Sequence, residues 1–129
     1  MRKILLFATA ILLLTACQES LENRAQRTLK EYSEKNCPMQ LSETILMDSC
    51  AFEMDTHTLH YYYTLMGTLD NDSTLNTTVM RQMLIDALRN ETQTRIFKEA
   101  GYNFKYTYYS QTQKGKVIFE TLMTKEDYQ

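Results

Sequence analysis

The chain has 129 residues, of which 43% are hydrophobic and 23% charged, and its net charge is −2. If the first 16 residues are removed, as argued below, Arg2 and Lys3 go with them. The remaining 113 residues then carry 12 basic and 16 acidic side chains. That length suits one domain and is too short for two of ordinary size. A mildly acidic chain without a basic cluster is unsuited to nucleic acid, so we expect no nucleic-acid partner.

The first residues have the form of a secretory signal peptide. Met1-Arg2-Lys3 gives a positive start, and the run from Ile4 to Leu14 is apolar except for Thr9. This run of about 11 residues is far shorter than the ~20 that a membrane-spanning helix needs. Leu14-Thr15-Ala16-Cys17 resembles a bacterial lipobox. The resemblance implies that residues 1–16 are removed and that Cys17 carries a diacylglycerol and an N-acyl chain such as palmitate.

A lipidated Cys17 predicts a protein of the bacterial cell envelope that is held at a membrane by its acyl chains, with each buried methylene contributing roughly 0.8 kcal/mol. Gln18 is not the aspartate that retains some lipoproteins in the inner membrane, so the outer membrane is favoured, on its periplasmic or its surface side. We expect residues 17–23 to form the lipidated N-terminus and a tether, and residues 24–129 to form one domain.

Two further cysteines, Cys37 and Cys50, would lie in a compartment that permits disulfides. Their pairing would close a loop of about 14 residues and stabilise the domain by roughly 3 kcal/mol in the chain-entropy model. We favour this disulfide over the alternative of two buried thiols. The Cys-x-x-Cys spacing of redox proteins is absent, so we expect no redox role.

The first half of the chain predicts one helix and two strands. Apolar residues at helical spacing predict a helix from Leu21 to about Ser33, and Pro38 prevents its continuation. Alternating patterns predict strands over Ile45–Met54 and Leu59–Met66. Asp55-Thr56-His57 between them has the length and chemistry of a hairpin turn.

The second half repeats the order of helix, strand and strand. After a polar loop over residues 67–74, the pattern predicts a single helix from Asn76 or Thr77 to Ala100, ended by Gly101. The apolar pattern is lost over residues 89–94, so a bend or an exposed turn there is the alternative to a straight helix. The cleanest alternation runs from Tyr102 to Tyr108, and a turn over residues 111–115 leads into a strand over 116–124. We expect the polar tail, residues 125–129, to be loose.

Two consecutive hairpins and two one-sided helices predict an α+β fold of αββαββ order. The expected architecture is a four-stranded antiparallel sheet with both helices on one face. The other sheet face would be open or paired with a partner.

This arrangement resembles a group of small, poorly characterised exported bacterial proteins in which a helix leads to a proline and two strands, and a second helix leads to a tyrosine-rich hairpin. The matching positions are Pro38, Thr44-Ile45-Leu46, Leu59-His60-Tyr61-Tyr62-Tyr63-Thr64-Leu65, Gly101 and Tyr106-Thr107-Tyr108. The group places its cysteines elsewhere, in the second helix and near the C-terminus. The resemblance implies the fold and no particular activity.

Nine tyrosines and no tryptophan make the aromatic residues the most informative candidates for a binding site. Tyr61, Tyr63, Tyr106 and Tyr108 alternate toward the helices and are expected in the core. On the opposite face we expect an aromatic patch of a kind that recognises proteins or sugars. Its members are His60, Tyr62, Met66 and Tyr109.

Catalytic and metal signatures are weak. His57 and His60 are the only histidines, and a spacing of three on a strand directs them to opposite faces. We therefore expect exposed histidines of a turn and a strand, and no metal site. A thiol–imidazole pair of Cys50 with either histidine is disfavoured, and no serine lies in a nucleophile motif. Asp72-Ser73-Thr74 matches an acceptor motif for bacterial O-glycosylation, with a plain solvated loop as the alternative.

We therefore expect a non-enzymatic, lipid-anchored binding module without a cofactor, whose partner is a protein or a glycan. The alternative is an inhibitor or immunity-type protein that acts through the loops 67–74 and 111–115.

Overall fold

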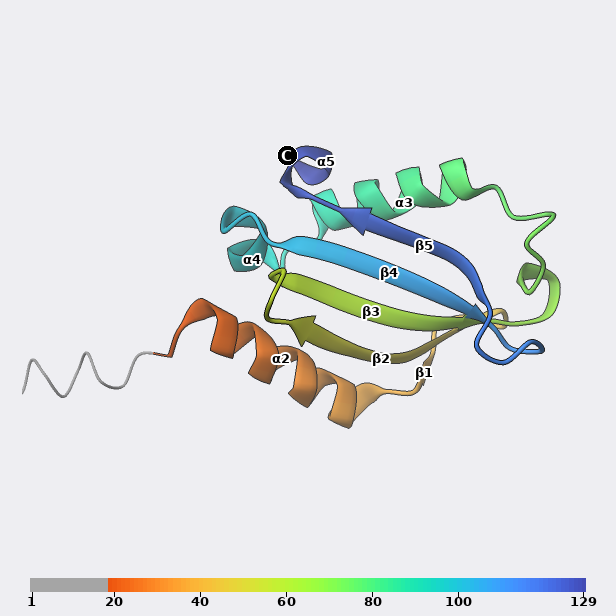
Figure 1. Cartoon of the computed structure of the whole chain (residues 1–129), viewed down its shortest axis with the longest axis horizontal. Helices are drawn as coiled ribbons and strands as arrows, with labels where there is room; N and C mark the ends of the chain where they lie inside the picture. Colours follow the sequence, from red (N-terminus) through yellow and green to blue (C-terminus); the bar gives the residue numbers. More distant parts are fainter. Residues whose placement is uncertain (1–18) are drawn as a thin grey trace, which may run out of the picture.

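The computed structural model describes residues 19–129, so the signal peptide and Cys17 lie outside the described residues. The described chain forms helices and strands in alternation (Figure 1). The helices are α2 (Leu21–Asn36), α3 (Thr77–Asn90), α4 (Arg95–Glu99) and α5 (Lys125–Tyr128), with a short 3-10 turn, η1 (Gly67–Leu69). The strands are β1 (Met39–Gln40), β2 (Ile45–Glu53), β3 (Thr58–Leu65), β4 (Asn103–Ser110) and β5 (Val117–Met123). The α+β class expected from the sequence is confirmed.

The strands form one mixed sheet in the order β1-β2-β3-β4-β5. Neighbouring strands are antiparallel except β3 and β4, which run parallel. The prediction of four antiparallel strands is therefore wrong in strand number and in direction. Helices α3 and α4 return the chain from the end of β3 to the end of the sheet where β3 begins. Strand β4 therefore runs parallel to β3, and the connection is a β-α-β crossover. The added strand, β1, has only two residues, too few for a pattern.

Helix α2 has a capped N-terminus and an apolar side that packs on the sheet. The Ser20 side chain accepts a hydrogen bond from the backbone N–H of Asn23 and so caps the helix start. Ala25 and Leu29 are its buried residues and pack against the sheet. The helix begins at Leu21, inside the segment 17–23 that was expected to be a tether. The described part of the tether is therefore only Glu19 and Ser20.

The predicted single helix over residues 77–100 is wrong, because the chain breaks into α3 and α4. The break falls where the apolar pattern stops. Glu91 follows the last turn of α3 and its carboxylate accepts hydrogen bonds from the backbone N–H and hydroxyl groups of Thr94. The ammonium group of Lys98 donates to the carbonyls of Leu88 and Glu91, which are left unpaired at the helix end. Gly101 follows α4 with a φ of +77°, the left-handed conformation expected for the glycine that ends a helix.

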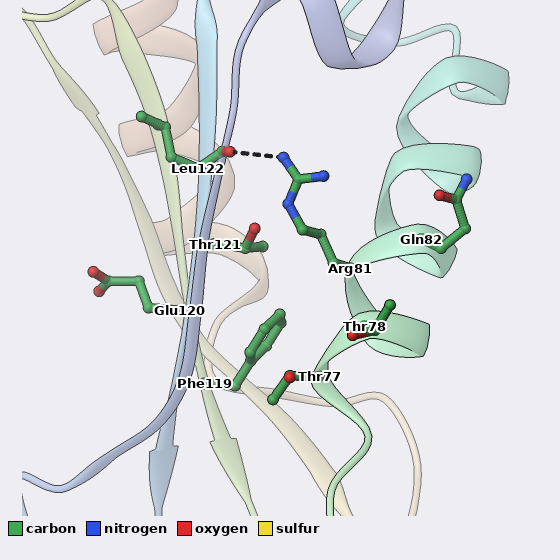
Figure 2. A pocket seen from close by; sticks show the side chains of 8 residues that line it. All are labelled: Thr77, Thr78, Arg81, Gln82, Phe119, Glu120, Thr121 and Leu122. Carbon is green, nitrogen blue, oxygen red and sulfur yellow. Dashed lines mark hydrogen bonds between the residues drawn. The ribbon is translucent and has the colours of Figure 1, made fainter.

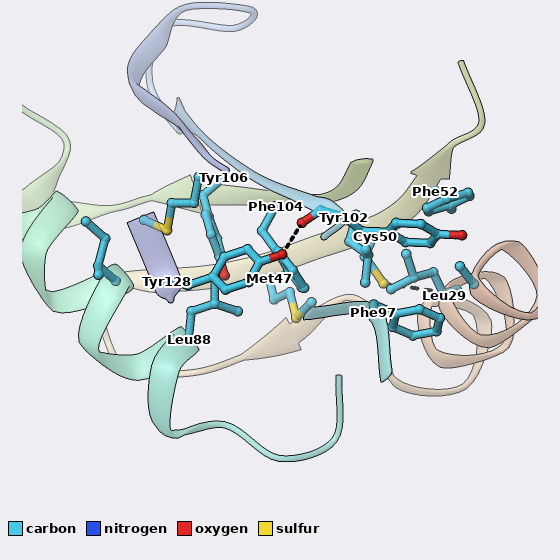
Figure 3. Packing of buried hydrophobic residues seen from close by; sticks show 14 of the residues in the cluster. Leu29, Met47, Cys50, Phe52, Leu88, Phe97, Tyr102, Phe104, Tyr106 and Tyr128 are labelled. Carbon is cyan, nitrogen blue, oxygen red and sulfur yellow. Dashed lines mark hydrogen bonds between the residues drawn. The ribbon is translucent and has the colours of Figure 1, made fainter. Parts of the chain in front are cut away.

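The core lies between the sheet and the helices and includes the C-terminal residues (Figure 3). Tyr128 of α5 is 7% exposed, and its ring meets the edge of Phe104 at a centroid distance of 5.6 Å. Its hydroxyl donates to the carbonyl of Tyr102 at 2.9 Å. Thr124 and Asp127 form a capping box at the start of α5. The expectation of a loose tail is therefore wrong, because one aromatic anchor fixes an otherwise polar segment.

The predicted disulfide is also wrong, since Cys37 and Cys50 are both free thiols. Cys50 is 4% exposed on β2 and its Sγ donates to the carbonyl of Leu29 at 3.4 Å. Cys37 follows the last turn of α2, where its backbone N–H bonds to the carbonyl of Ser33. The two residues therefore serve the packing of α2 on β2 and the end of α2. The alternative of two buried thiols holds for Cys50, whereas Cys37 is only half-buried.

Candidate functional site

The most distinctive surface feature is an apolar groove on the helix-covered face of the sheet. Helix α2 packs on β2, whereas α3 lies along β5 and α5, so the two helices occupy opposite margins of the same face (Figure 1). The central strands β3 and β4 lie between these margins. The cavity there has a volume of about 400 Å³. We call it the tyrosine groove, after the four tyrosines that line it, Tyr32 of α2 and Tyr61, Tyr63 and Tyr106 of the sheet.

Each wall of the tyrosine groove comes from a different element. Leu29 and Tyr32 of α2 form one wall, and Leu84, Ala87 and Leu88 of α3 form the other. The remaining apolar lining residues are Met39, Leu41, Met47, Leu59 and Phe97. Tyr32 and Leu41 are 38% and 49% exposed, so large apolar side chains border the groove at the surface. The groove is therefore a continuation of the core that remains open to solvent.

The groove tyrosines keep their hydroxyl groups available. Within residues 19–129, the hydroxyl of Tyr128 is hydrogen-bonded to backbone carbonyls and that of Tyr102 interacts with Glu22, whereas no hydrogen bond to the hydroxyls of Tyr61, Tyr63 or Tyr106 is present in this part of the chain. All fully buried side-chain polar atoms of this part of the chain are paired. The hydroxyls of Tyr61, Tyr63 and Tyr106 are thus free to donate to an occupant. Burial raises the pKa of all three, so these groups are protonated donors at neutral pH.

The tyrosines of β3 and β4 on the helix-covered face, including Tyr108 beyond the groove, form a stacked ladder. Tyr61 and Tyr106 stack at a centroid distance of 5.5 Å, and Tyr63 and Tyr108 stack at 4.6 Å. Tyr106 and Tyr108 are buried, as the sequence predicted, whereas Tyr61 and Tyr63 are only half-buried. The alternation therefore identified which face these rings occupy. The alternation did not predict that Tyr61 and Tyr63 remain partly exposed between the helices. Side-chain alternation carries no information on how far apart the helices lie.

The opposite sheet face carries the aromatic patch predicted from the sequence. His60 stacks on Tyr62 at 4.0 Å and Tyr62 on Tyr109 at 6.5 Å. Tyr62 and Tyr109 are half-buried. Met66 lies just past β3 and its backbone N–H bonds to the carbonyl of Thr44. Three of the four predicted residues are therefore brought together, and a binding role for them stays a prediction.

The expectation of an exposed His60 is wrong, because this side chain is engaged in a polar network and is only 6% exposed. Its Nδ1 lies 2.5 Å from the carboxylate of Glu53, and its Nε2 lies 2.7 Å from the hydroxyl of Thr107. Thr107 donates in turn to Glu120, 2.7 Å away, and Lys105 pairs with the same carboxylate. The bond from Thr107 and the charge of Lys105 hold the pKa of Glu120 below its usual value. The network ties β2, β3, β4 and β5 together across this face.

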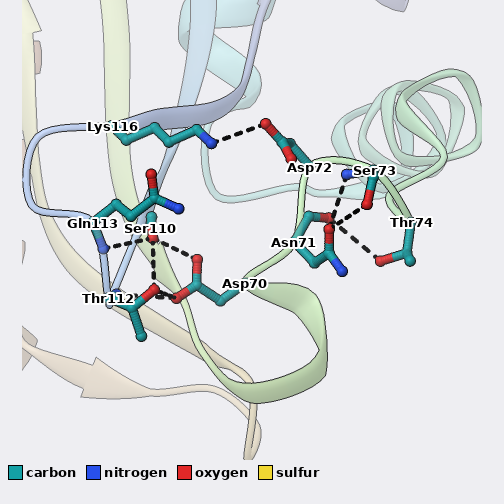
Figure 4. A network of polar contacts seen from close by, with 9 residues as sticks. All are labelled: Asp70, Asn71, Asp72, Ser73, Thr74, Ser110, Thr112, Gln113 and Lys116. Atoms are coloured by element: carbon teal, nitrogen blue, oxygen red, sulfur yellow. Dashed lines mark hydrogen bonds and ion pairs between the residues drawn. The ribbon is translucent and has the colours of Figure 1, made fainter.

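The loops of the alternative hypothesis, 67–74 and 111–115, lie side by side at one end of the sheet (Figure 4). Asp70 accepts hydrogen bonds from the hydroxyl of Ser110 at 2.5 Å and from the backbone N–H of Thr112 at 3.0 Å. These bonds lower the pKa of Asp70. Lys116 pairs with Asp72 at 2.9 Å. The exposed Ser73 donates to Asn71 in the same region.

A second hollow, of about 500 Å³, lies between the start of α3 and β5 (Figure 2). Arg81 reaches across it and donates to the carbonyl of Leu122, and it also pairs with Asp127 at 3.1 Å. The guanidinium of Arg81 therefore fastens α3 to β5 and α5. Because this cation already has protein partners and the hollow is largely polar, the tyrosine groove is the stronger candidate site.

Groups that could carry out catalysis are dispersed. His57 lies 3.6 Å from Glu22 and stacks on Tyr102, at the end of the sheet away from the loops 67–74. Cys50 faces α2, and burial raises the pKa of its thiol to about 11. Within residues 19–129 no three His, Cys, Asp or Glu side chains are grouped so that they could hold a metal ion. No helix of that part of the chain has both the length and the apolar character required to cross a membrane.

Residues 20–119 match the family model described as a domain of unknown function, DUF8479. This chain belongs to that family. Residues 1–18 match the model of the prokaryotic membrane lipoprotein lipid attachment site. The predicted lipoprotein signal is therefore confirmed, and it places this DUF8479 protein in the bacterial envelope in association with a membrane. No curated protein matches the chain.

Three solved structures share the fold of this DUF8479 protein. The protein PA3611 of Pseudomonas aeruginosa, described as secreted, is 15% identical with a TM-score of 0.68, over 87% of this chain and 100% of its own. The pilotin EpsS of the Vibrio vulnificus type 2 secretion system is 13% identical with a TM-score of 0.65, over 84% and 92%. The type II secretion system pilotin AspS of Vibrio cholerae is 15% identical with a TM-score of 0.62, over 83% and 91%.

Proposed function

We propose that this DUF8479 protein is a non-enzymatic lipoprotein of the outer membrane, anchored through acyl chains on Cys17, that binds a helical segment of a protein partner in the tyrosine groove. The observation that carries the proposal is the groove itself. It is a cavity of about 400 Å³ that is lined by apolar side chains, yet it remains open to solvent. Open apolar surface of this kind marks binding sites in soluble domains.

An amphipathic α-helix is a suitable occupant, because the groove presents apolar side chains between α2 and α3 and remains open to solvent. Helices α2 and α3 lie toward β2 and β5, which are separated by three strand spacings, about 14 Å in all. A third helix packed between them at the usual ~8–10 Å on each side would need about 16–20 Å. The partner helix is therefore expected to lie across the mouth of the groove and to insert its apolar side chains toward Tyr61, Tyr63 and Tyr106. Polar groups of the partner helix, beside its apolar face, could accept hydrogen bonds from the tyrosine hydroxyls.

The nature of the partner is suggested by the shared fold. Two of the structures similar to this chain are pilotins of type II secretion systems. A lipid attachment site together with this fold supports a pilotin-like role, with a component of a secretion system as the partner. The non-enzymatic part of the proposal is supported by the raised pKa of Cys50 and by the separation of His57 from His60 on different surfaces.

Site-specific photo-crosslinking in the native envelope tests the proposal. A photoreactive residue at Ala87, on the exposed rim of the groove, is expected to cross-link a protein whose captured peptide has an apolar helical face. The matched control is Val79, which is 51% exposed on the same helix but does not line the groove. A third probe at Tyr62 reports on the opposite sheet face. Cross-links from Tyr62 with none from Ala87 would refute the groove as the binding site.

A further inference from the structure

The anchor attachment point and the first turn of α2 are separated by very little chain. Ser20 is the N-cap of α2, so three Cα–Cα steps connect it to Cys17. Each step spans 3.8 Å, so the reach is at most about 11 Å. Both carboxylate oxygens of Glu19 also accept hydrogen bonds from Arg27, which holds Glu19 against α2. The N-terminal end of α2 must therefore stay close to any membrane that holds Cys17.

The turn between β2 and β3 is fixed to this end of α2. His57 lies 3.6 Å from Glu22 in the first turn of α2, and its ring stacks on Tyr102 at 4.9 Å. Asn103, at the start of β4, donates from its backbone N–H to the carbonyl of His57 and from its side chain to the carbonyl of Thr56. The end of the domain next to the anchor is thus one connected surface, on the left in Figure 1.

The opposite end of the sheet lies too far away to contact the same membrane in an upright domain. The eight residues of β3 separate the two ends by about 26 Å at the usual rise of ~3.3 Å per residue. The loops joined by Asp70 lie at that far end (Figure 4). Because α2 runs from the anchored end toward the far end, Tyr32 and Leu41 border the groove away from the anchor.

The anchored end presents one large apolar side chain on its turn. Met54 is 40% exposed, directly after β2, and is followed by the exposed polar residues Asp55 and Thr56. The charges at this end are mixed, because Glu22 and Asp55 are acidic, whereas Arg24 lies near the start of α2 and the side chain of Lys125 lies beside Gly101. We therefore ascribe the contact to the apolar side chain and not to attraction between a basic surface and anionic lipid. An apolar side chain on a polar turn fits the headgroup region of a zwitterionic phospholipid surface.

We propose that the protein stands upright on the bilayer, with the β2–β3 turn and Met54 against a zwitterionic phospholipid surface and the far loops directed away from it. The inference rests on the lipid anchor of the proposed function but not on the tyrosine groove. It assigns to the turn a role as a membrane contact, which fixes the side from which a partner can approach.

Tryptophan fluorescence tests this orientation without background, because the chain has no tryptophan. Met54→Trp, Tyr62→Trp and Lys114→Trp report on the turn, the open sheet face and the far end, respectively. Each variant is prepared as the lipidated full-length mature protein and reconstituted into phosphatidylcholine–phosphatidylethanolamine vesicles containing brominated acyl chains. We expect bromolipid to quench the emission of Met54→Trp at least two-fold and to leave the other two nearly unchanged. Asp55→Trp replaces Met54→Trp if that variant fails to fold.

Two outcomes overturn the inference. Equal quenching at positions 54 and 114 in protein that floats with the vesicles would mean that the domain tumbles freely on its anchor. Strongest quenching at Tyr62→Trp would mean that the domain lies on its open sheet face. Flotation of each sample is measured in parallel. Lipidated protein that does not float would refute the anchoring itself, and the orientation with it, whereas floating protein with the wrong quenching pattern refutes the orientation alone.

Discussion

The C-terminal segment offers the sharpest test of the packing. Five polar-looking residues follow β5, yet Tyr128 is 7% exposed and its hydroxyl reaches the carbonyls of Tyr102 and Lys98. The substitution Tyr128→Ala removes an aromatic ring from the core. Losses of about 3–5 kcal/mol are usual for a large aromatic side chain replaced by alanine, and a terminal helix that can fray belongs at the lower end. We therefore expect Tyr128→Ala to lower the free energy of unfolding by about 3 kcal/mol.

A second variant separates the ring from its hydroxyl. Tyr128→Phe keeps the edge-on contact with Phe104 and removes only the hydrogen bonds. A hydrogen bond of this kind contributes about 1 kcal/mol, so the expected loss is about a third of that for alanine. Tyr109→Ala, at a half-buried position on the open sheet face, is the matched control and should cost about 1 kcal/mol.

Urea unfolding of the three variants, followed by circular dichroism, measures these differences. A domain of this size is stabilised by only about 5–15 kcal/mol, so a loss of 3 kcal/mol moves the midpoint clearly at an unchanged slope. If Tyr128→Ala stays within about 0.5 kcal/mol of the natural protein, the C-terminal helix is not packed on the core and the reasoning fails.

Three further predictions use simpler measurements. After denaturation without reductant, alkylation should label both Cys37 and Cys50, because both are free thiols. In the folded protein Cys50 should resist alkylation because it is buried. Cysteines that stay unlabelled in the denatured protein would show that a disulfide is present. The folded-state pKa of Asp70 is lowered, so the stability it contributes is present above its unfolded pKa of about 4 and is lost as the pH falls further. Asp70→Asn should therefore weaken the pH dependence of the unfolding midpoint below about pH 4. The same pH dependence in the variant and the natural protein would show that Asp70 does not make this contribution. Cys17→Ser should release the protein from the membrane fraction, and undiminished membrane association would refute lipidation at that residue.

The elements of the fold were largely predictable, because each has a strong local signal. The alternation in Leu59–Met66 and Tyr102–Tyr108 located β3 and β4, and Gly101 adopts the positive φ expected at the end of a helix. The pairing of the strands was not predictable from those signals. Alternation looks the same in parallel and antiparallel strands, and the direction of β4 depends on how far the connection through α3 and α4 returns along the sheet.

The candidate site was also predictable only in its local features. The period of two placed Tyr61 and Tyr106 on the helix-covered face, and the structure agrees. Whether that face is closed depends on where α2 and α3 lie across the sheet, which is set by tertiary packing and not by any local pattern. The C-terminal helix was missed for a related reason, since one buried tyrosine among polar residues gives no period. The free thiols were missed because an oxidising compartment permits a disulfide but does not place two cysteines in bonding geometry.

Binding through the tyrosine groove is tested most directly by titrating the cross-linked partner segment, as a synthetic peptide, against three forms of the lipid-free domain. The forms are the natural sequence, Ala87→Trp, which fills the groove from its rim, and Val79→Trp, which adds the same bulk elsewhere on α3. The account predicts at least ten-fold weaker binding to Ala87→Trp and unchanged binding to Val79→Trp. Equal affinity of all three forms would contradict it.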